Sequence, residues 1–238
     1  MSNSPFQFKQ FTVQQNKTAM KVGTDGVLLG AWAEINADVF NILDIGAGTG
    51  LIALIMAQRS DAEVIDAIEL NDDAYEQTVD NFEVSDWGDR LFCYHASLQE
   101  FVEEIEDTYD LIISNPPFYT STYKELSKER AMARHSESLP YSDLLSGTAK
   151  LLSEIGTCAF IIPFSDEENF IEIAKSNNLF INRITRVKGT FDAPIKRSLL
   201  QFSFEEKAIE QNELVIEIER HLYTDAYKIL VQDYYLKM

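Results

Sequence analysis

Cysteine is scarce in this chain of 238 residues, and long apolar runs are missing. The two cysteines, Cys93 and Cys158, lie within the apolar stretches "LFCYH" and "TCAFII". This placement predicts buried thiols in a reducing compartment and argues against a disulfide scaffold or a metal site. No apolar run reaches the ~18 residues of a membrane span. The start, "MSNSPFQFKQF", lacks the apolar region of a signal peptide. We therefore expect a cytoplasmic protein with no membrane partner and no metal.

Positive charge is also scarce, because 20 Lys and Arg face 39 Asp and Glu, a net charge of −19. Such a charge argues at first against a nucleic-acid partner. The acids are unevenly distributed, however. Residues 38–114 carry 19 acids and two bases, whereas residues 181–200 carry one acid and five bases. One face of the molecule could therefore hold an anion while the rest repels it. The alternative is a charge that serves solubility alone.

Apolar runs of strand length alternate with segments of helical periodicity. The expected strands lie at 41–45, 62–70, 90–95, 109–114 and 156–163, and the expected helices at 24–35, 51–60, 72–85, 97–105, 141–153 and 166–177. Two last strands, 180–187 and 198–204, leave no room for a helix between them and predict an antiparallel hairpin. In the third of these helices, Ala74, Val79 and Phe82 should form the buried side. The alternation predicts an α/β fold with a mostly parallel sheet and helices on both faces.

A glycine turn, "LDIGAGTG", joins the first strand of this series to the following helix. Gly46, Gly48 and Gly50 allow a sharp backbone turn and the close approach of a ligand. The pattern is one residue shorter than the dinucleotide fingerprint, and Asp44 precedes it. Glu69 ends the second strand, where a carboxylate can accept hydrogen bonds from both ribose hydroxyls. Turn and acid together predict a nucleoside-containing cofactor, with a purely structural turn as the alternative.

This shortened turn with its preceding aspartate resembles the Rossmann-like S-adenosylmethionine-dependent methyltransferases. The resemblance implies a seven-stranded sheet whose last strand is antiparallel, which fits the closing hairpin, and S-adenosylmethionine as cofactor. In this class an acid often follows the third strand, near the adenine of the cofactor. Here "YHASLQ" places Ser97 at that position. His95 lies nearby, and we interpret it as a packed side chain.

The fourth strand of the series ends in "NPPF", residues Asn115, Pro116, Pro117 and Phe118. Proline cannot donate to a sheet and restricts the residue before it, so strand pairing must stop at Asn115. The motif resembles the signature of amino-methyltransferases, which implies that these four residues are catalytic. The Asn115 side-chain oxygen and the Pro116 carbonyl could each accept an N–H of a planar amine, and Phe118 could stack on a base. The alternative is a proline turn that merely ends a strand.

Residues 11–35, "FTVQQNKTAMKVGTDGVLLGAWAEI", form a second specific stretch. Together with the glycine turn, "NPPFY" and "RAMARH", this stretch resembles the bacterial tRNA1(Val) (adenine(37)-N6)-methyltransferase family, and the resemblance covers nearly the whole chain. It implies methylation of N6 of adenosine 37, beside the anticodon of that tRNA. One alternative is a protein glutamine-N5 methyltransferase of the release-factor type, although those enzymes usually carry a helical domain before the sheet. Another is a catalytically silent module that only binds the cofactor.

The division of the chain and the substrate contacts complete these expectations. Residues 1–37 should form an extension over the cofactor and substrate cleft, and residues 38–238 the methyltransferase domain. Thr24 or Asp25 should cap the helix in the extension, and Asp25 could also accept the amino group of the cofactor. Basic side chains are the candidates for contact with tRNA, each with a solvated surface role as alternative: Lys21, Lys124, Lys128, Arg130, Arg134, Arg186, Lys188, Lys196 and Arg197. We expect a monomer or a weak dimer.

Overall fold

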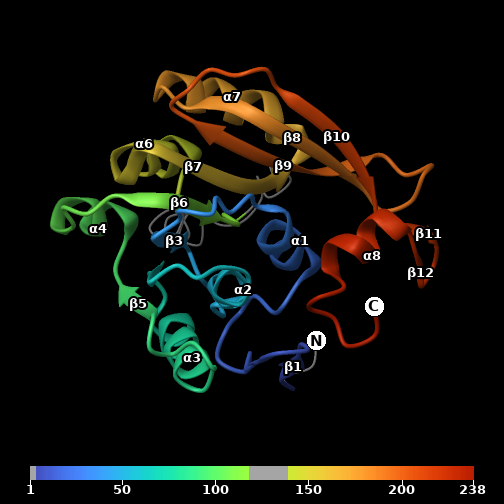
Figure 1. Cartoon of the computed structure of the whole chain (residues 1–238), viewed down its shortest axis with the longest axis horizontal. Helices are drawn as coiled ribbons and strands as arrows, with labels where there is room; N and C mark the ends of the chain where they lie inside the picture. Colours follow the sequence, from blue (N-terminus) through green and yellow to red (C-terminus); the bar gives the residue numbers. More distant parts are fainter. Residues whose placement is uncertain (1–3, 118–138) are drawn as a thin grey trace, which may run out of the picture.

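The computed structural model describes residues 4–117 and 139–238. Helices cover both faces of a central eight-stranded sheet (Figure 1). Five of the candidate site residues lie outside the described residues: Phe118, Lys124, Lys128, Arg130 and Arg134.

The strands of the sheet follow the order β10-β8-β9-β7-β6-β3-β4-β5. Their bounds are β3 Asn41–Ile45, β4 Val64–Glu69, β5 Leu91–His95, β6 Tyr109–Ser114, β7 Leu152–Pro163, β8 Phe180–Lys188, β9 Ile195–Ser203 and β10 Glu210–Val215. Among the described strands of this sheet, only β9 runs antiparallel to its neighbours β7 and β8, and all other pairs are parallel. The predicted mostly parallel α/β sheet with a closing antiparallel hairpin is therefore confirmed.

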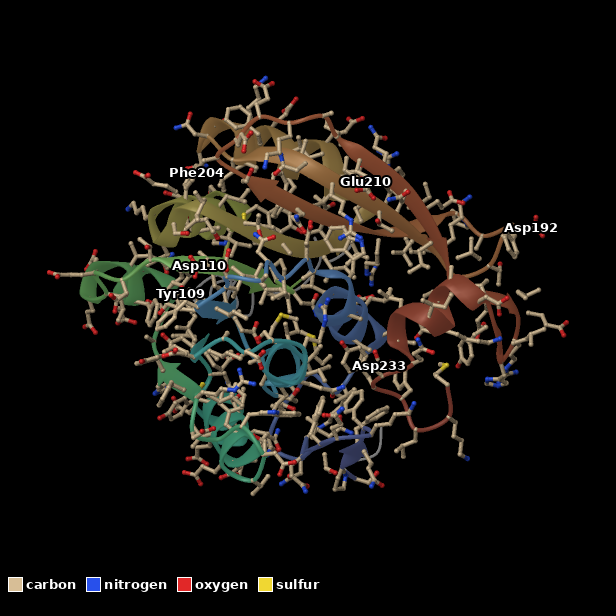
Figure 2. The ribbon with its side chains drawn as sticks, in the orientation of Figure 1. Tyr109, Asp110, Asp192, Phe204, Glu210 and Asp233 are labelled. Atoms are coloured by element: carbon tan, nitrogen blue, oxygen red, sulfur yellow. The ribbon has the colours of Figure 1, made fainter. Side chains whose placement is uncertain are left out.

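The count of seven strands was one too low, because β10 adds a parallel strand outside β8. Its sequence, "EQNELV", opens with four exposed polar residues. A segment with so little apolar alternation gives no strand signal in the sequence. Glu210 begins this strand at the outer edge of the sheet (Figure 2).

Two apolar cores lie on the two faces of the sheet. One is formed with α1 (Thr24–Trp32), α2 (Leu51–Arg59), α3 (Asp72–Glu83) and α8 (Asp225–Val231). The other is formed with α4 (Leu98–Glu104), α6 (Tyr141–Leu151) and α7 (Glu167–Ser176), which follows the short 3-10 helix η2 (Phe164–Asp166). In α1 every residue from Gly26 to Trp32 is buried, so this part of the N-terminal segment folds together with the sheet. Burial of these faces is the main force that holds the layers together.

The two ends of the chain pack on each other, as Figure 1 shows. The hairpin of β1 (Phe6–Gln7) and β2 (Thr12–Val13) is followed along the chain by α1, and β11 (Glu217–Glu219) and β12 (Leu222–Tyr223) precede α8. Phe8 pairs with Tyr235 in an isolated bridge, with ring centroids 5.8 Å apart. The ring centroids of Phe6 and Phe8 lie 4.8 Å apart. This aromatic cluster ties the N-terminal hairpin to the C-terminal segment.

The cysteines are both free thiols, as predicted. Cys158 is fully buried, and Cys93 is partly buried. Burial raises the pKa of Cys93 to about 12, and the charges of Glu69 and Asp44 add to this effect. The Cys93 thiol is therefore protonated and unreactive at neutral pH. No helix among the described residues is long and apolar enough to span a membrane.

Helix α3 departs from its predicted pattern. Ala74 and Phe82 are buried as expected, but Val79 is only half-buried, so its assignment to the core was wrong. The remaining buried positions of the helix are polar: Gln77, Thr78 and Asn81. Apolar periodicity cannot find such a face, because the side chains are buried for their hydrogen bonds rather than for their hydrophobicity.

Candidate active site

Three neighbouring strands place the predicted site at one edge of the sheet. Asp44 in β3 pairs with Ile113 in β6 and with Ala67 in β4, so the carboxyl ends of these strands lie side by side. The Ser114 hydroxyl donates to the Ile45 carbonyl at 2.7 Å and holds β6 against β3. Adjacent strands lie about 4.8 Å apart, so Asn115, the start of the glycine turn and Glu69 lie within about 10 Å of one another. In parallel sheets this edge is where ligands bind.

The three glycines of the turn all have positive φ, 75° at Gly46, 62° at Gly48 and 75° at Gly50. A side chain would be strained at each position. A Cβ added at Gly46 or Gly48 would meet no described atom within 4 Å, whereas one at Gly50 would lie 2.6 Å from Cε1 of Phe82. The first two glycines therefore line a space that a ligand can enter. Gly50, by contrast, is needed for close packing of the turn against α3.

Glu69 is held in place by the backbone on both sides. One carboxylate oxygen accepts from the Gly48 N–H at 2.8 Å, and the other accepts from the Asn71 N–H at 2.9 Å. Each oxygen keeps a lone pair for a further donor. The carboxylate is thus oriented before any ligand arrives, in a form that can accept two hydroxyl groups.

Asp44 lies beneath the turn and is fully buried. Its Oδ2 accepts from the Ala53 N–H at 3.2 Å, which ties β3 to α2, while Oδ1 has no partner among the described residues. Burial raises the pKa of Asp44 to about 7, against the opposing hydrogen bond from Ala53, and the charge of Glu69 raises it further. The carboxyl group therefore changes its protonation state near neutral pH.

Asn115 presents a second buried acceptor without a partner. Its Oδ1 is shielded from solvent and forms no hydrogen bond with the described residues. Leaving such an atom unpaired costs about 1–3 kcal/mol, so native proteins rarely tolerate it without a reason. Pro116 behind it is buried and Pro117 is exposed. An oriented acceptor, stiffened by two prolines, stands at the end of β6 beside the glycine turn.

At the rim of this edge, Asp25 forms an ion pair with Arg197, with 2.8 Å between Oδ2 and Nε. The N-cap of α1 is Gly23, and no side chain caps the helix. The expectation that Thr24 or Asp25 caps α1 was therefore wrong. The reason is that the Asp25 carboxylate faces the guanidinium on β9 instead of the first turn of its own helix. Arg197, a candidate phosphate contact, is thus shared with an acid from the N-terminal segment.

Two further candidates are engaged in local structure. Lys21 donates to the carbonyl oxygens of Gln15 and Thr18, the second at 2.8 Å, and so stabilises its own loop. Ser97 is the N-cap of α4 in a capping box, in which its hydroxyl accepts from the Glu100 N–H at 3.2 Å. A role of Ser97 near the adenine stays a prediction.

The remaining candidates differ in exposure. His95 stacks on Tyr75, with ring centroids 5.0 Å apart, but it is exposed, and its Nε2 lies 2.9 Å from Oδ1 of Asp72. Its side chain is therefore packed on one face only. Lys196 is exposed. The turn that joins β8 to β9, with Asp192 near its tip, projects from the body of the protein (Figure 2).

The basic candidates Arg186 and Lys188 are paired with acids. Nη2 of Arg186 lies 2.6 Å from Oε1 of Glu167, and Nζ of Lys188 lies 2.9 Å from Oε2 of Glu213. These pairs leave less positive charge at the rim than the sequence count indicated. Two residues of α3 that the sequence did not reveal, Thr78 and Asn81, donate hydrogen bonds from their side chains to the glycine turn. Their only sequence signal is that they share a helix face with buried residues.

Comparison with known proteins agrees with this geometry. A family model described as "Methyltransferase small domain" matches residues 23–139. A tRNA1(Val) (adenine(37)-N6)-methyltransferase from Christiangramia forsetii is 59% identical over 240 residues, with 100% of both chains covered. A relative of the same name from Trichodesmium erythraeum is 43% identical, also with 100% of both chains covered.

Among solved structures, a predicted O-methyltransferase from Agrobacterium tumefaciens superposes with a TM-score of 0.68. The match covers 88% of this chain and 96% of that chain at 18% identity, which shows a common fold. The sequence relatives cover the whole length of the chain, and the solved structure covers 88% of it. It belongs to the family of tRNA1(Val) (adenine(37)-N6)-methyltransferases.

Proposed function

We propose that the protein transfers a methyl group from S-adenosylmethionine to N6 of adenosine 37 in tRNA1(Val). Its full-length relatives carry this activity in their names. The observation that supports it in this chain is the Oδ1 of Asn115 at the end of β6, which is buried and has no hydrogen-bond partner among the described residues. An acceptor held in that state is suited to receive an N–H from an amine that enters the site.

The residues of the glycine turn fit the cofactor. Gly46 and Gly48 leave room beside the backbone, and the carboxylate of Glu69 is oriented to accept the two ribose hydroxyls. Asp25, Asp44 and Ser97 are the other candidate contacts. Bound S-adenosylmethionine supplies an electrophilic methyl group.

The chain itself must prepare a poor nucleophile. The lone pair of the N6 amine is delocalised into the adenine ring. Oδ1 of Asn115 and the carbonyl of Pro116 can each accept one N–H, which orients the nitrogen and favours localisation of its lone pair. The prolines limit motion of both acceptors. After transfer the nitrogen carries an extra proton, which passes to one of these acceptors or to water.

The substrate contacts of the proposal lie partly outside the described residues. Phe118 would stack on the flipped adenine. The phosphate contacts would come from basic side chains in two segments: Lys124, Lys128, Arg130, Arg134, Lys196 and Arg197. Residues 1–37 would cover the cleft, and a tRNA substrate would place the enzyme in the cytoplasm.

A methyl-transfer assay with labelled S-adenosylmethionine tests this function. We expect label in tRNA1(Val), at position 37 after nuclease digestion and mass spectrometry of the fragments. The matched control is the same tRNA with guanosine at position 37, which should take up no label. Transfer to a glutamine of a release factor instead would favour the alternative enzyme, and transfer to neither would favour a silent binding module.

A further inference from the structure

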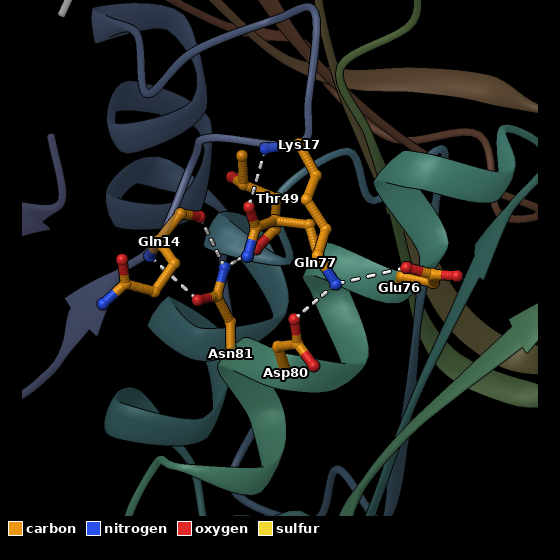
Figure 3. Close-up of polar contacts among 7 residues, drawn as sticks. All are labelled: Gln14, Lys17, Thr49, Glu76, Gln77, Asp80 and Asn81. Carbon is orange, nitrogen blue, oxygen red and sulfur yellow. Dashed lines mark hydrogen bonds and ion pairs between the residues drawn. The ribbon is translucent and has the colours of Figure 1, made fainter. Parts of the chain in front are cut away.

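The polar face of α3 is the feature that the proposed reaction leaves unexplained. Gln77, Thr78 and Asn81 are each at most 1% exposed. Burial of polar groups is costly unless they are hydrogen-bonded. All three have partners, and those partners come from two segments that are distant in sequence. Figure 3 shows the contacts of Gln77 and Asn81.

The amide of Asn81 joins the two segments. Its Nδ2 donates to the Thr49 carbonyl in the glycine turn and to the Gln14 carbonyl, both at 2.9 Å. Its Oδ1 accepts from the Gln14 N–H at 2.8 Å. Both polar backbone groups of Gln14 are thus bound by one side chain, which also holds the turn (Figure 3).

The neighbouring side chains of α3 each bind one segment only. The Thr78 hydroxyl donates to the Gly48 carbonyl at 3.1 Å, and the Gln77 Oε1 accepts from the Lys17 N–H at 3.0 Å. Gly48 also donates its N–H to Glu69. The turn is therefore held from the cofactor side by Glu69 and from the helix side by α3.

The second segment, residues 14–22, is here called the strap. It is held together internally, since the Gln15 Oε1 accepts from the Val22 N–H at 2.9 Å and Lys21 binds the Gln15 carbonyl. The strap leads directly into Gly23, the N-cap of α1, and then to Asp25 with its ion pair to Arg197 at the rim. A shift of the strap would therefore be passed to the rim of the site.

We propose that Asn81 is a positioning residue that couples the strap to the glycine turn. Cofactor that settles on the turn would then also order the strap, because a single buried amide bonds both. By linkage, a loosened strap would weaken cofactor binding to the same extent. This inference rests on the proposed function only in naming S-adenosylmethionine as the ligand.

The test measures binding of S-adenosylmethionine alone, by calorimetry, together with hydrogen exchange of the strap amides. In the wild-type protein, saturating cofactor should slow exchange in residues 14–22. Asn81→Ala should bind cofactor roughly 5- to 30-fold more weakly. Its strap should no longer respond to the ligand. Gln77→Leu, which touches the strap but not the turn, should also bind more weakly, by roughly 2- to 10-fold.

Lys17→Ala is the matched control. It removes only the exposed ion pairs of the strap with Glu76 and Asp80, at 3.2 and 2.8 Å, which contribute little. Its affinity should stay within about twofold of wild type. A folded Asn81→Ala variant with unchanged affinity, or with a strap that still responds to cofactor, would overturn the proposal. If Asn81→Ala does not fold, a Gln77→Leu variant with wild-type affinity for the cofactor would overturn the proposal.

The proposed function and this inference can fail separately. The binding and exchange measurements contain no RNA, so their failure leaves the tRNA substrate untouched. Conversely, a protein that couples strap and cofactor but methylates no tRNA would refute only the proposed function.

Discussion

Replacement of Asn115 by alanine should stabilise the protein and inactivate it at the same time. The Oδ1 of Asn115 is buried and finds no partner in residues 4–117 and 139–238, and such an unpaired atom costs the folded state about 1–3 kcal/mol. The side chain is only half-buried, so its truncation loses little packing. The free energy of unfolding of Asn115→Ala should therefore be about 1 kcal/mol higher than that of the wild type in the absence of ligands. Most substitutions lower this free energy instead.

The same substitution should lower the rate of methyl transfer about 10²–10³-fold, equivalent to about 3–4 kcal/mol of transition-state stabilisation. Urea unfolding gives the first quantity and single-turnover transfer to tRNA1(Val) the second, and calorimetry should show unchanged cofactor affinity. Asn115→Asp keeps an acceptor and should retain part of the activity, less a desolvation penalty. An alanine variant that loses more than about 1 kcal/mol of stability, or that turns over at the wild-type rate, would refute the reasoning.

Three further predictions concern the glycine turn and its carboxylates. Well below pH 3.8 Asp44 is protonated in both states, and between pH 3.8 and about 7 the unfolded chain loses the proton while the folded protein keeps it. The shift of the Asp44 pKa from 3.8 to about 7 therefore lowers the free energy of unfolding by up to about 4 kcal/mol as pH rises over this window. Urea unfolding should show this loss in the wild-type protein and not in Asp44→Asn. Glu69→Ala should weaken S-adenosylmethionine binding by about 1–3 kcal/mol in calorimetry, and unchanged affinity in a folded variant would remove Glu69 from the site. Gly50→Ala should lower the melting temperature, because its Cβ would meet the Phe82 ring at 2.6 Å, whereas Gly48→Ala, with free space around it, should lose less stability.

The sequence was sufficient for the parts of the fold that depend on apolar periodicity and backbone geometry. The strands that end at Ile45, Glu69 and Ser114 were expected at 41–45, 62–70 and 109–114, and the structure places them side by side. The glycine turn was recognisable because positive φ admits few other residues. These signals are local, so a single chain can reveal them.

The parts that the sequence could not reveal depend on tertiary partners. Asp25 stands at the start of a helix, where an acid usually caps, but Arg197 lies 172 positions later and attracts its carboxylate. From the sequence, Asn81 cannot be distinguished from a solvated helix residue. Its hydrogen bonds with the glycine turn and Gln14 appear only in the structure. Only three-dimensional contact decides between these roles.

Strand β10 determines what the sheet presents to other protein molecules. An edge strand with open N–H and C=O groups is a template for pairing with a second chain, and nature blunts such edges with charge. Here β10 covers β8, and its first four residues, "EQNE", are exposed and include two carboxylates. Both carboxylates form ion pairs with bases of β8, Glu210 with Arg183 and Glu213 with Lys188, so a second copy that docked edge to edge would have to disturb these pairs. The added strand should therefore keep the protein dispersed at concentrations at which a sheet that ended at β8 would aggregate.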